Sequence, residues 1–152
     1  MSYHWQTKSF QALGNDELYR ILRLRQEVFV IEQQCFYQDL DGKDQQATHI
    51  LCWLGTELMA YQRCLPPGTS YSESSMGRIV VASAARGSGL GRELVARGIR
   101  HNEEQWPASD IRINAQAYLE AFYTDLGFAT QGDAYDEDGI MHVQMLYLAQ
   151  GE

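Results

Sequence analysis

The chain has 152 residues, of which 45% are hydrophobic and 21% are charged, a composition typical of a globular domain that buries its own core. The formal net charge of −8 argues against a nucleic-acid partner, because phosphate backbones are bound by clustered Lys and Arg. No apolar run approaches the ~18 residues of a membrane-spanning helix, and the opening MSYHWQTKSF lacks an apolar signal region, so we expect one cytoplasmic domain over residues 1–152 and no membrane partner.

The first predicted element is a helix. Apolar residues recur at helical spacing from Leu18 to Phe29, which predicts a helix that begins after Asn15 and runs to about Gln33. We expect Asn15 to cap this helix, because its side-chain oxygen can accept a hydrogen bond from a backbone N–H of the first turn.

A polar loop, CFYQDLDGKDQQ, follows this helix. Its spaced aspartates resemble part of a calcium loop, but Tyr37 stands where the first acidic ligand belongs. The three cysteines and four histidines of the chain also lack the paired spacing of a zinc site. We therefore expect inert thiols and no metal site.

Strands and helices alternate through the rest of the chain. Alternating and β-branched patterns predict strands at 49–54, 58–65, 77–83, 111–115, 128–130 and 140–148. Apolar spacing predicts helices at 90–105 and 118–125, ended by Pro107 and by Gly127. Segment 66–75 is expected to be a surface loop by its composition. This order of elements predicts a mixed α/β or α+β fold, a sheet with helices on both faces.

Three glycines at alternate positions, Gly87, Gly89 and Gly91, separate the strand pattern at 77–83 from the helix pattern at 90–105. The first turn of a helix has unpaired N–H groups and the positive end of the helix dipole, and glycine lets backbone N–H groups approach an anion closely. This pattern predicts a phosphate-binding loop, to which Arg86 and Arg92 add charged donors.

The motif is neither a Walker loop, which ends in Gly-Lys-Ser/Thr, nor the GxGxxG dinucleotide fingerprint. RGSGLG, residues 86–91, resembles the R/Q-x-x-G-x-G/A motif of the GNAT family of acetyl-CoA-dependent N-acetyltransferases, and AFYTDLGF, residues 121–128, resembles the late helix of that family. The segments VFVIEQQCFYQDLDGKD, GRIVV, INAQAYLEAFY and YDEDGIMHVQM are similar to its ElaA-like branch. The resemblance covers about residues 3 to 148.

The resemblance implies the acyl-CoA N-acyltransferase fold, with a mostly antiparallel sheet that opens between strands 77–83 and 111–115 to hold the pantetheine arm. It places the backbone N–H of Val81 against the thioester carbonyl and Tyr123 beside the sulfur, as the two catalytic groups. Gln116 falls where many relatives have Asn or Arg. The implied contacts with acetyl-CoA, the cosubstrate, are Ile79, Val81, Arg86, Gly87, Ser88, Gly89, Leu90, Gly91, Arg92 and Gln116.

The resemblance implies an acetyl-CoA-dependent N-acyltransferase, in which a primary amine attacks the thioester directly in a ternary complex. Many relatives carry a glutamate on the strand before the phosphate loop, but GRIVVAS contains no carboxylate. This feature favours the alternative, a non-catalytic CoA-binding or interaction module. For an enzyme, the general base is water or one of six candidates: Glu32, Asp39, Asp41, His49, Glu137 or His142.

Two acidic segments are expected to border the acceptor site in this fold. The first contains Asp39, Asp41 and Asp44, and the second contains Asp133, Asp136, Glu137 and Asp138. They predict a cationic acceptor, a small amine or a protein amine, unless they simply form a solvated surface. A C-terminal edge strand in this fold would also allow a homodimer.

Overall fold

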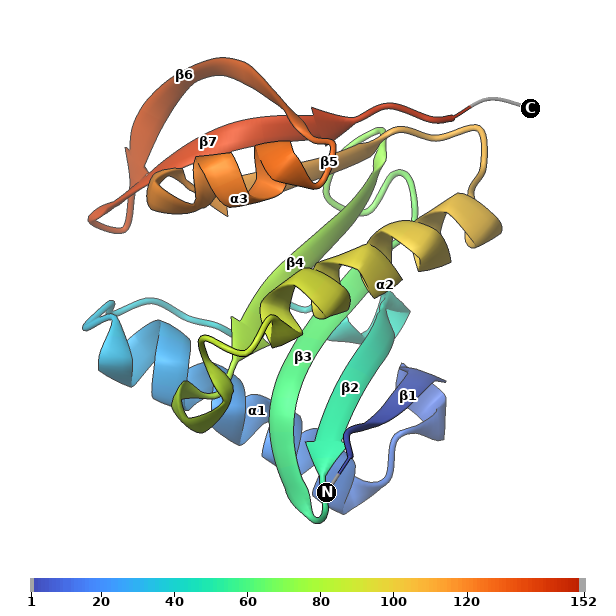
Figure 1. Ribbon diagram of the computed structural model, residues 1–152, viewed down its shortest axis with the longest axis vertical. Helices are drawn as coiled ribbons and strands as arrows, with labels where there is room; N and C mark the ends of the chain where they lie inside the picture. The colour runs from blue at the N-terminus through green and yellow to red at the C-terminus, as the bar shows by residue number, and fades with distance from the viewer. Residues whose placement is uncertain (1, 151–152) are drawn as a thin grey trace.

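The computed structural model describes residues 2–150 and contains a seven-stranded sheet in the order β1-β2-β3-β4-β5-β7-β6 (Figure 1). The strands are β1 His4–Ser9, β2 Thr48–Leu54, β3 Glu57–Leu65, β4 Ser74–Val81, β5 Ile111–Gln116, β6 Ala129–Glu137 and β7 Ile140–Tyr147. Neighbouring strands are antiparallel except β4 and β5, which are parallel. The expected mixed, mostly antiparallel sheet is therefore confirmed.

Three α-helices pack on this sheet. They are α1 Asn15–Arg25, α2 Leu90–Gln105 and α3 Glu120–Asp125. The π-helical segment η2, Gln26–Glu32, continues α1, and short 3-10 turns lie at η1 Phe10–Ala12, η3 Asp44–Gln46, η4 Ser83–Ala85 and η5 Ala117–Leu119. No helix in residues 2–150 is long and apolar enough to cross a membrane.

The two faces of the sheet are covered by different helices (Figure 1). Leu94 and Val95 of α2 are buried against Ile50 on one face, whereas Ile21 of α1 is buried with Leu51 on the other. Adjacent residues of β2 thus belong to different cores, because successive side chains of a strand point to opposite faces. Helices on both faces were expected and are confirmed.

The sheet opens between β4 and β5. These strands pair only where Ser74 faces Ile111 and Ser75 faces Arg112, although β4 continues to Val81. Beyond those two pairs the strands diverge, and within residues 2–150 the backbone groups that face the gap have no strand partner. This is the splayed gap that the sequence resemblance implied.

The C-terminal strands present one apolar and one polar face. Ile113 and Ala115 of β5 lie in the core with Val143 and Met145 of β7. The residues between them point to the other face, where Asn114 faces Gln144, Gln116 faces His142, and His142 faces Tyr135 of β6. This polar face lies beside the gap and supplies one wall of the candidate site.

Several element boundaries differ from the expectation. The edge strand β1 was missed, because none of its residues is buried and its sequence shows little apolar alternation. β4 begins at Ser74, inside the segment expected to be loop, because Asn102 of α2 donates hydrogen bonds to the Ser74 hydroxyl and the Ser75 carbonyl, both at 3.2 Å. β6 extends to Glu137 rather than Thr130, since it pairs with β7 along most of its length.

The expected cap of the first helix was also wrong. Gly14 occupies the cap position and Asn15 is the first helical residue. The carboxylate of Glu17 accepts a hydrogen bond from the Gly14 N–H at 2.8 Å, so this acidic side chain satisfies a backbone donor at the helix start. The predicted end near Gln33 agrees with the end of η2.

Candidate active site

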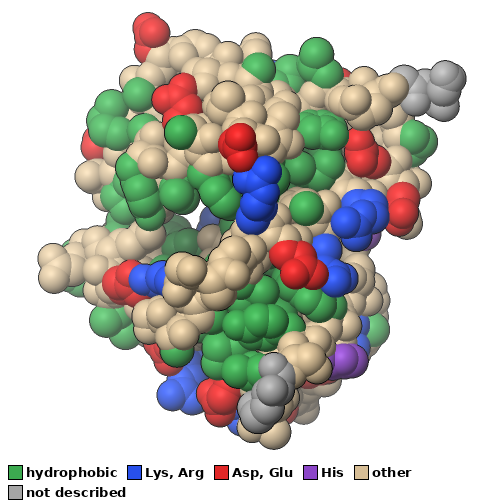
Figure 2. Space-filling model, viewed as in Figure 1, with side chains coloured by type: hydrophobic (Ala, Val, Ile, Leu, Met, Phe, Trp, Pro, Cys, Tyr) green, Lys and Arg blue, Asp and Glu red, His purple; other side chains and the backbone are tan. Residues whose placement is uncertain are grey.

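The gap between β4 and β5 opens into a cavity of about 670 Å³ that passes between the two halves of the molecule. Figure 2 shows the hollow between the upper and lower halves of the surface. Its walls come from β4, β5, the glycine loop and α3, and from η2 and the β6–β7 hairpin. Elements far apart in sequence thus meet where the sheet opens between β4 and β5.

The glycine loop forms one mouth of the cavity. Gly87 and Gly89 have φ of 81° and 83°, a left-handed conformation that strains any other residue, and Gly89 is the residue from which α2 begins. A Cβ at either glycine would meet no atom within 4 Å. The space in front of the loop is therefore open, as a site for an anion at a helix start requires.

Other residues of the glycine motif differ in what they offer. Leu90 lines the cavity but is only 3% exposed, as part of the core, and a Cβ at Gly91 would lie 3.6 Å from a methyl of Val81. Ser88 lies outside the lining, and its hydroxyl donates to the carbonyl of Ala85 at 2.7 Å. Its side chain is thus used within the turn, which leaves its backbone as the group available to a ligand.

The two arginines expected at a phosphate are both engaged in ion pairs. Arg86 contacts Glu32 of η2 through two nitrogens, at 2.6 and 3.0 Å, and donates from Nε to the carbonyl of Val81 at 3.1 Å. Arg92 contacts Asp125 at 2.5 Å. The hydrogen bond and charge of Arg86 lower the pKa of Glu32, which argues against Glu32 as a base.

The backbone N–H of Val81 points into the gap. The N–H of Ala82 donates to the carbonyl of Met59 on β3 at 2.8 Å, and Val81 is paired with Ala60. Since N–H directions alternate along a strand, the Val81 N–H faces away from β3. The N–H and the carbonyl of one strand residue point to the same side. The carbonyl of Val81 accepts a hydrogen bond from Nε of Arg86, which is not on β3, and this agrees with an N–H that faces away from β3. The register between β3 and β4 shifts a few residues earlier, near Arg78, whose φ is 51°.

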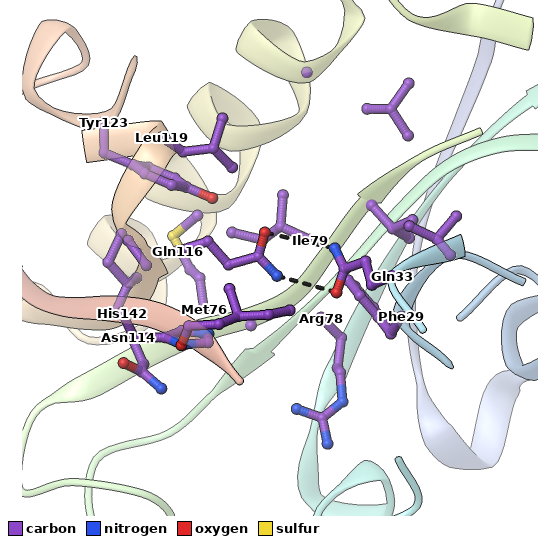
Figure 3. Close-up of a pocket in the computed structure, with 18 of the residues that line it drawn as sticks. Phe29, Gln33, Met76, Arg78, Ile79, Asn114, Gln116, Leu119, Tyr123 and His142 are labelled. Atoms are coloured by element: carbon purple, nitrogen blue, oxygen red, sulfur yellow. Dashed lines mark hydrogen bonds between the residues drawn. The ribbon is translucent and has the colours of Figure 1, made fainter. Parts of the chain in front are cut away.

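Tyr123 of α3 presents its hydroxyl to the cavity (Figure 3). The ring is held edge-on by Phe122 and Phe128, with centroids 5.1 and 5.8 Å away. Burial raises the pKa of this phenol, so the hydroxyl keeps its proton at neutral pH. No hydrogen-bond partner of the hydroxyl is found within residues 2–150. It is thus a protonated donor, free to bond a ligand.

The side chain of Gln116 is paired with that of Gln33 in the cavity. Its side-chain amide and that of Gln33 exchange hydrogen bonds, at 3.2 and 3.5 Å, and the pair crosses the cavity (Figure 3). Close by, the thiol of Cys35 donates to the carbonyl of Asp138 at 3.2 Å. Two contacts thus link the segment after η2 to the C-terminal half of the sheet across the opening.

Ile79 and Met76 of β4 add apolar surface to the cavity wall.

The acidic loop after η2 is neutralised by arginines. Asp39, Asp41 and Asp44 contact three guanidinium groups, those of Arg25, Arg63 and Arg78, at distances from 2.5 to 3.4 Å. Burial alone would raise the pKa of Asp41, but the hydrogen bond and charge of Arg63 hold it below its usual value. Three negative and three positive charges cancel, so the expected attraction of a cation by this loop is wrong. The lowered pKa of Asp41 also makes this carboxylate a poor base.

His49 lies outside the cavity lining. Its ring is fully buried and sits between the hydroxyl of Tyr61, at 2.6 Å, and the carbonyl of Asp44, at 2.9 Å. Burial lowers its pKa. His49 is therefore a structural residue that joins the acidic loop to the sheet.

The opposite end of the cavity is bounded by the β6–β7 hairpin. Glu137, Asp138 and His142 line it, whereas Asp133 and Asp136 are exposed residues of β6 outside the lining. The two oxygens of Glu137 lie 3.2 and 3.1 Å from the amide nitrogen of Asn114. Glu137 and Asp138 belong to the second of the two acidic segments. Within residues 2–150, neither carboxylate forms an ion pair, so both are available at this end of the cavity.

Sequence reasoning missed Asn114 and Gln33. Asn114 also contacts the hydroxyl of Tyr135. A signal for it existed in the strand INAQ, where Asn114 and Gln116 alternate with apolar residues, because polar residues at alternate positions of a central strand indicate a polar face. Gln33 carried no such signal, since its partner is 83 residues away.

Comparisons with known proteins agree with this architecture. The sequence matches the family described as "Acetyltransferase (GNAT) domain" over residues 9–149. A UPF0039 protein of Synechocystis sp. is 40% identical over 148 residues, 97% of this chain and 96% of that protein. Protein ElaA of Escherichia coli (strain K12) is 38% identical over 143 residues, 93% of this chain and 94% of ElaA.

Solved structures with the same fold include two at high sequence identity. The crystal structure of an acyl-CoA N-acyltransferase from Pseudomonas aeruginosa has a TM-score of 0.90 at 39% identity and covers 96% of this chain and 99% of that one. Escherichia coli ElaA has a TM-score of 0.91 at 36% identity, with the same shares of the two chains.

Proposed function

The chain belongs to the GNAT acetyltransferase family, and on that premise we propose that it transfers an acetyl group from acetyl-CoA to a primary amine. The observation that carries the proposal is the open gap, into which the Val81 N–H and the Tyr123 hydroxyl both point. A thioester lying in the gap would have one donor for its carbonyl oxygen and another for its sulfur.

In the proposed mechanism the cosubstrate enters by the glycine loop. The backbone N–H groups of Gly87, Gly89 and Gly91 receive its phosphates at the start of α2, while Leu90 packs in the core and positions the loop. The pantetheine arm pairs with the free edge of β4 at Ile79 and Val81. Arg86 and Arg92 stand beside the phosphates and exchange their carboxylate partners for them. Gln116 contacts the arm where it crosses the amide pair.

The acceptor amine attacks the thioester carbon directly, in a ternary complex. As the C–N bond forms, the carbonyl electrons move to oxygen, and the Val81 N–H stabilises that charge by about 2.7–4 kcal/mol, the usual worth of one such donor. The C–S bond then breaks, and the Tyr123 hydroxyl donates a hydrogen bond, or its proton, to the departing thiolate. Because burial raises the pKa of this phenol, the hydroxyl is protonated when the thiolate forms and is able to donate that hydrogen bond.

The acceptor is proposed to be cationic. Glu137 and Asp138 line the far end of the cavity, and no Lys or Arg within residues 2–150 forms an ion pair with either. These two carboxylates replace the neutralised loop at Asp39–Asp44 as the source of attraction. A small amine, or a lysine side chain of a protein, has the required charge.

The test is release of free thiol from acetyl-CoA in the presence of amines that differ in charge. We expect turnover with amines that carry a second positive charge, weaker turnover with neutral or acidic amines, and a rate that falls as salt rises. Propionyl-CoA and longer acyl-CoAs, tested in parallel, identify the acyl group. Protection of the protein by CoA without thiol release from any acyl-CoA would favour the alternative, a non-catalytic CoA-binding module.

A further inference from the structure

His142 is held in a defined position on the polar face of the C-terminal strands. It faces Gln116 of β5 and Tyr135 of β6 in register, and its ring stacks on that of Tyr135 with centroids 6.4 Å apart and planes inclined by 29°. The residue is only 9% exposed and lines the cavity (Figure 3). The imidazole is thus fixed by its neighbours and open to the cavity.

The hydrogen bond of His142 determines which nitrogen is available. Nδ1 lies 2.8 Å from the carbonyl oxygen of Ile140. A carbonyl oxygen only accepts hydrogen bonds, so the neutral ring carries its hydrogen on Nδ1. Nε2 then presents a lone pair. It has no hydrogen-bond partner within residues 2–150, and it is not sealed from solvent.

The other candidate bases are engaged elsewhere. Glu32, Asp39 and Asp41 lie in ion pairs, and His49 is outside the cavity. Glu137 remains, but both of its oxygens are occupied by the Asn114 amide. An imidazole is also the better match to a base that works near neutral pH.

We infer that Nε2 of His142 is the general base that takes the proton from the acceptor amine, an inference that rests on the proposed function. An alkylammonium with a pKa of about 10.4 costs roughly 4–5 kcal/mol to deprotonate at pH 7. One ammonium proton passes to Nε2 and then to solvent, and the amine lone pair forms the C–N bond. The amine nitrogen loses a second proton after the attack. This proton ends on the sulfur of CoA, or restores the Tyr123 hydroxyl where that hydroxyl has given its own proton to the sulfur.

The first test measures the tautomer and needs no acceptor. Nitrogen-15 chemical shifts of the histidine rings, recorded at a pH where the rings are neutral, should show the hydrogen of His142 on Nδ1, with Nε2 unprotonated. Assignment is made by loss of the signals in His142→Gln. A ring with its hydrogen on Nε2 would overturn the inference, because that atom would have no lone pair to offer.

The second test uses amine acceptors of graded pKa with His142→Gln and wild type. With strongly basic amines we expect the variant to show a kcat about 100-fold below that of wild type, the lower end of the usual contribution of a positioned base. With weakly basic amines, which are already deprotonated, the loss should shrink to a few-fold. A merely structural residue would not produce this dependence. An equal loss across the series would overturn the inference.

Two variants serve as controls. His4→Gln changes an exposed histidine of β1, outside the cavity lining, and should leave kcat unchanged with every amine. Glu137→Gln should raise KM for cationic amines more than it lowers kcat. If Glu137→Gln, and not His142→Gln, shows a loss of kcat that is large with strongly basic amines and small with weakly basic amines, Glu137 is the base. If wild type turns over no amine, the proposed function fails, and the tautomer measurement still decides whether Nε2 is available.

Discussion

Arg86 of the glycine loop and Glu32 of η2 form a two-pronged ion pair, with N···O distances of 2.6 and 3.0 Å, across the mouth of the proposed cofactor site. Their side chains are 41% and 46% exposed, so the pair contributes little to stability, about 0–1 kcal/mol. The pair lies beside the loop that is proposed to bind phosphate, and it occupies a guanidinium that could otherwise contact a phosphate there.

Glu32→Gln should therefore leave catalysis nearly intact. The substitution keeps the size of the side chain, removes its charge and releases Arg86, which remains able to pair with a phosphate. We expect a kcat within about three-fold of the wild-type value and an equal or lower Kd for CoA. Steady-state kinetics and calorimetric titration with CoA measure the two quantities. If turnover instead fell by roughly 100-fold or more, Glu32 would be identified as the base.

Gly89→Asp should abolish protection of the protein by CoA. The aspartate places a negative charge in the proposed phosphate site, at a residue with φ of 83°. For wild type at a CoA concentration about 100 times Kd, binding to the native state adds about 2.7 kcal/mol, equivalent to a rise in Tm of roughly 5–10 °C in a thermal melt.

The matched control for this experiment is Gly55→Asp. Gly55 also has a positive φ, 60°, but it lies in the turn between β2 and β3, away from the cavity. Both variants share the backbone strain, so the difference between them reports the site alone. Equal protection of both by CoA would exclude the glycine loop as the phosphate site.

Tyr123→Phe should lower kcat by about 10–100-fold and leave the Kd for CoA within a few-fold. The ring that packs between Phe122 and Phe128 is retained, and only the hydroxyl is lost. A thiolate needs less help to leave than an alkoxide. We therefore expect the loss of kcat to lie at the lower end of the usual rate contribution of a positioned acid. Single-turnover rates at saturating acetyl-CoA measure the chemical step, and an unchanged rate would reduce Tyr123 to a packing residue.

Acid should unfold the protein through its buried ion-pair cluster. Burial alone would raise the pKa of Asp44, but the hydrogen bonds and charges of Arg25 and Arg63 hold it below its usual value. A carboxyl whose pKa is depressed on folding stabilises the native state fully above its unfolded pKa, near 3.9. This contribution is lost as pH falls through the lower folded value. Thermal melts from neutral pH to below about pH 3 should show Tm falling most steeply at the acid end of that range.

Asp44→Asn tests the origin of this dependence. Removing one partner of a buried ion pair costs about 3–5 kcal/mol, and the variant should also lose part of the acid dependence of Tm. Asp133→Asn, at an exposed residue of β6, should change the free energy of unfolding by less than about 0.5 kcal/mol. An Asp44→Asn variant as stable as wild type would show that the cluster contributes no net stability.

The sequence alone determined the features that depend on neighbours along the chain. Helix α2 begins at Leu90 and ends at Gln105 as predicted, because the glycine before it, the apolar spacing within it and Pro107 after it all act locally. The glycine motif and the aromatic pair before Gly127 also sufficed to indicate the family, and with it the splayed sheet.

The tertiary structure alone decided which side chains meet. Arg86 is 54 residues from Glu32 and Arg63 is 22 from Asp41, and no periodicity in the sequence indicates such pairs. They matter because an acidic side chain attracts a cation when it is free and not when a guanidinium neutralises it. The same reason separates the two candidate histidines. Chain folding buries His49 in the sheet and turns His142 to the cavity, where one ring nitrogen is bound to a carbonyl and the other has no partner among residues 2–150.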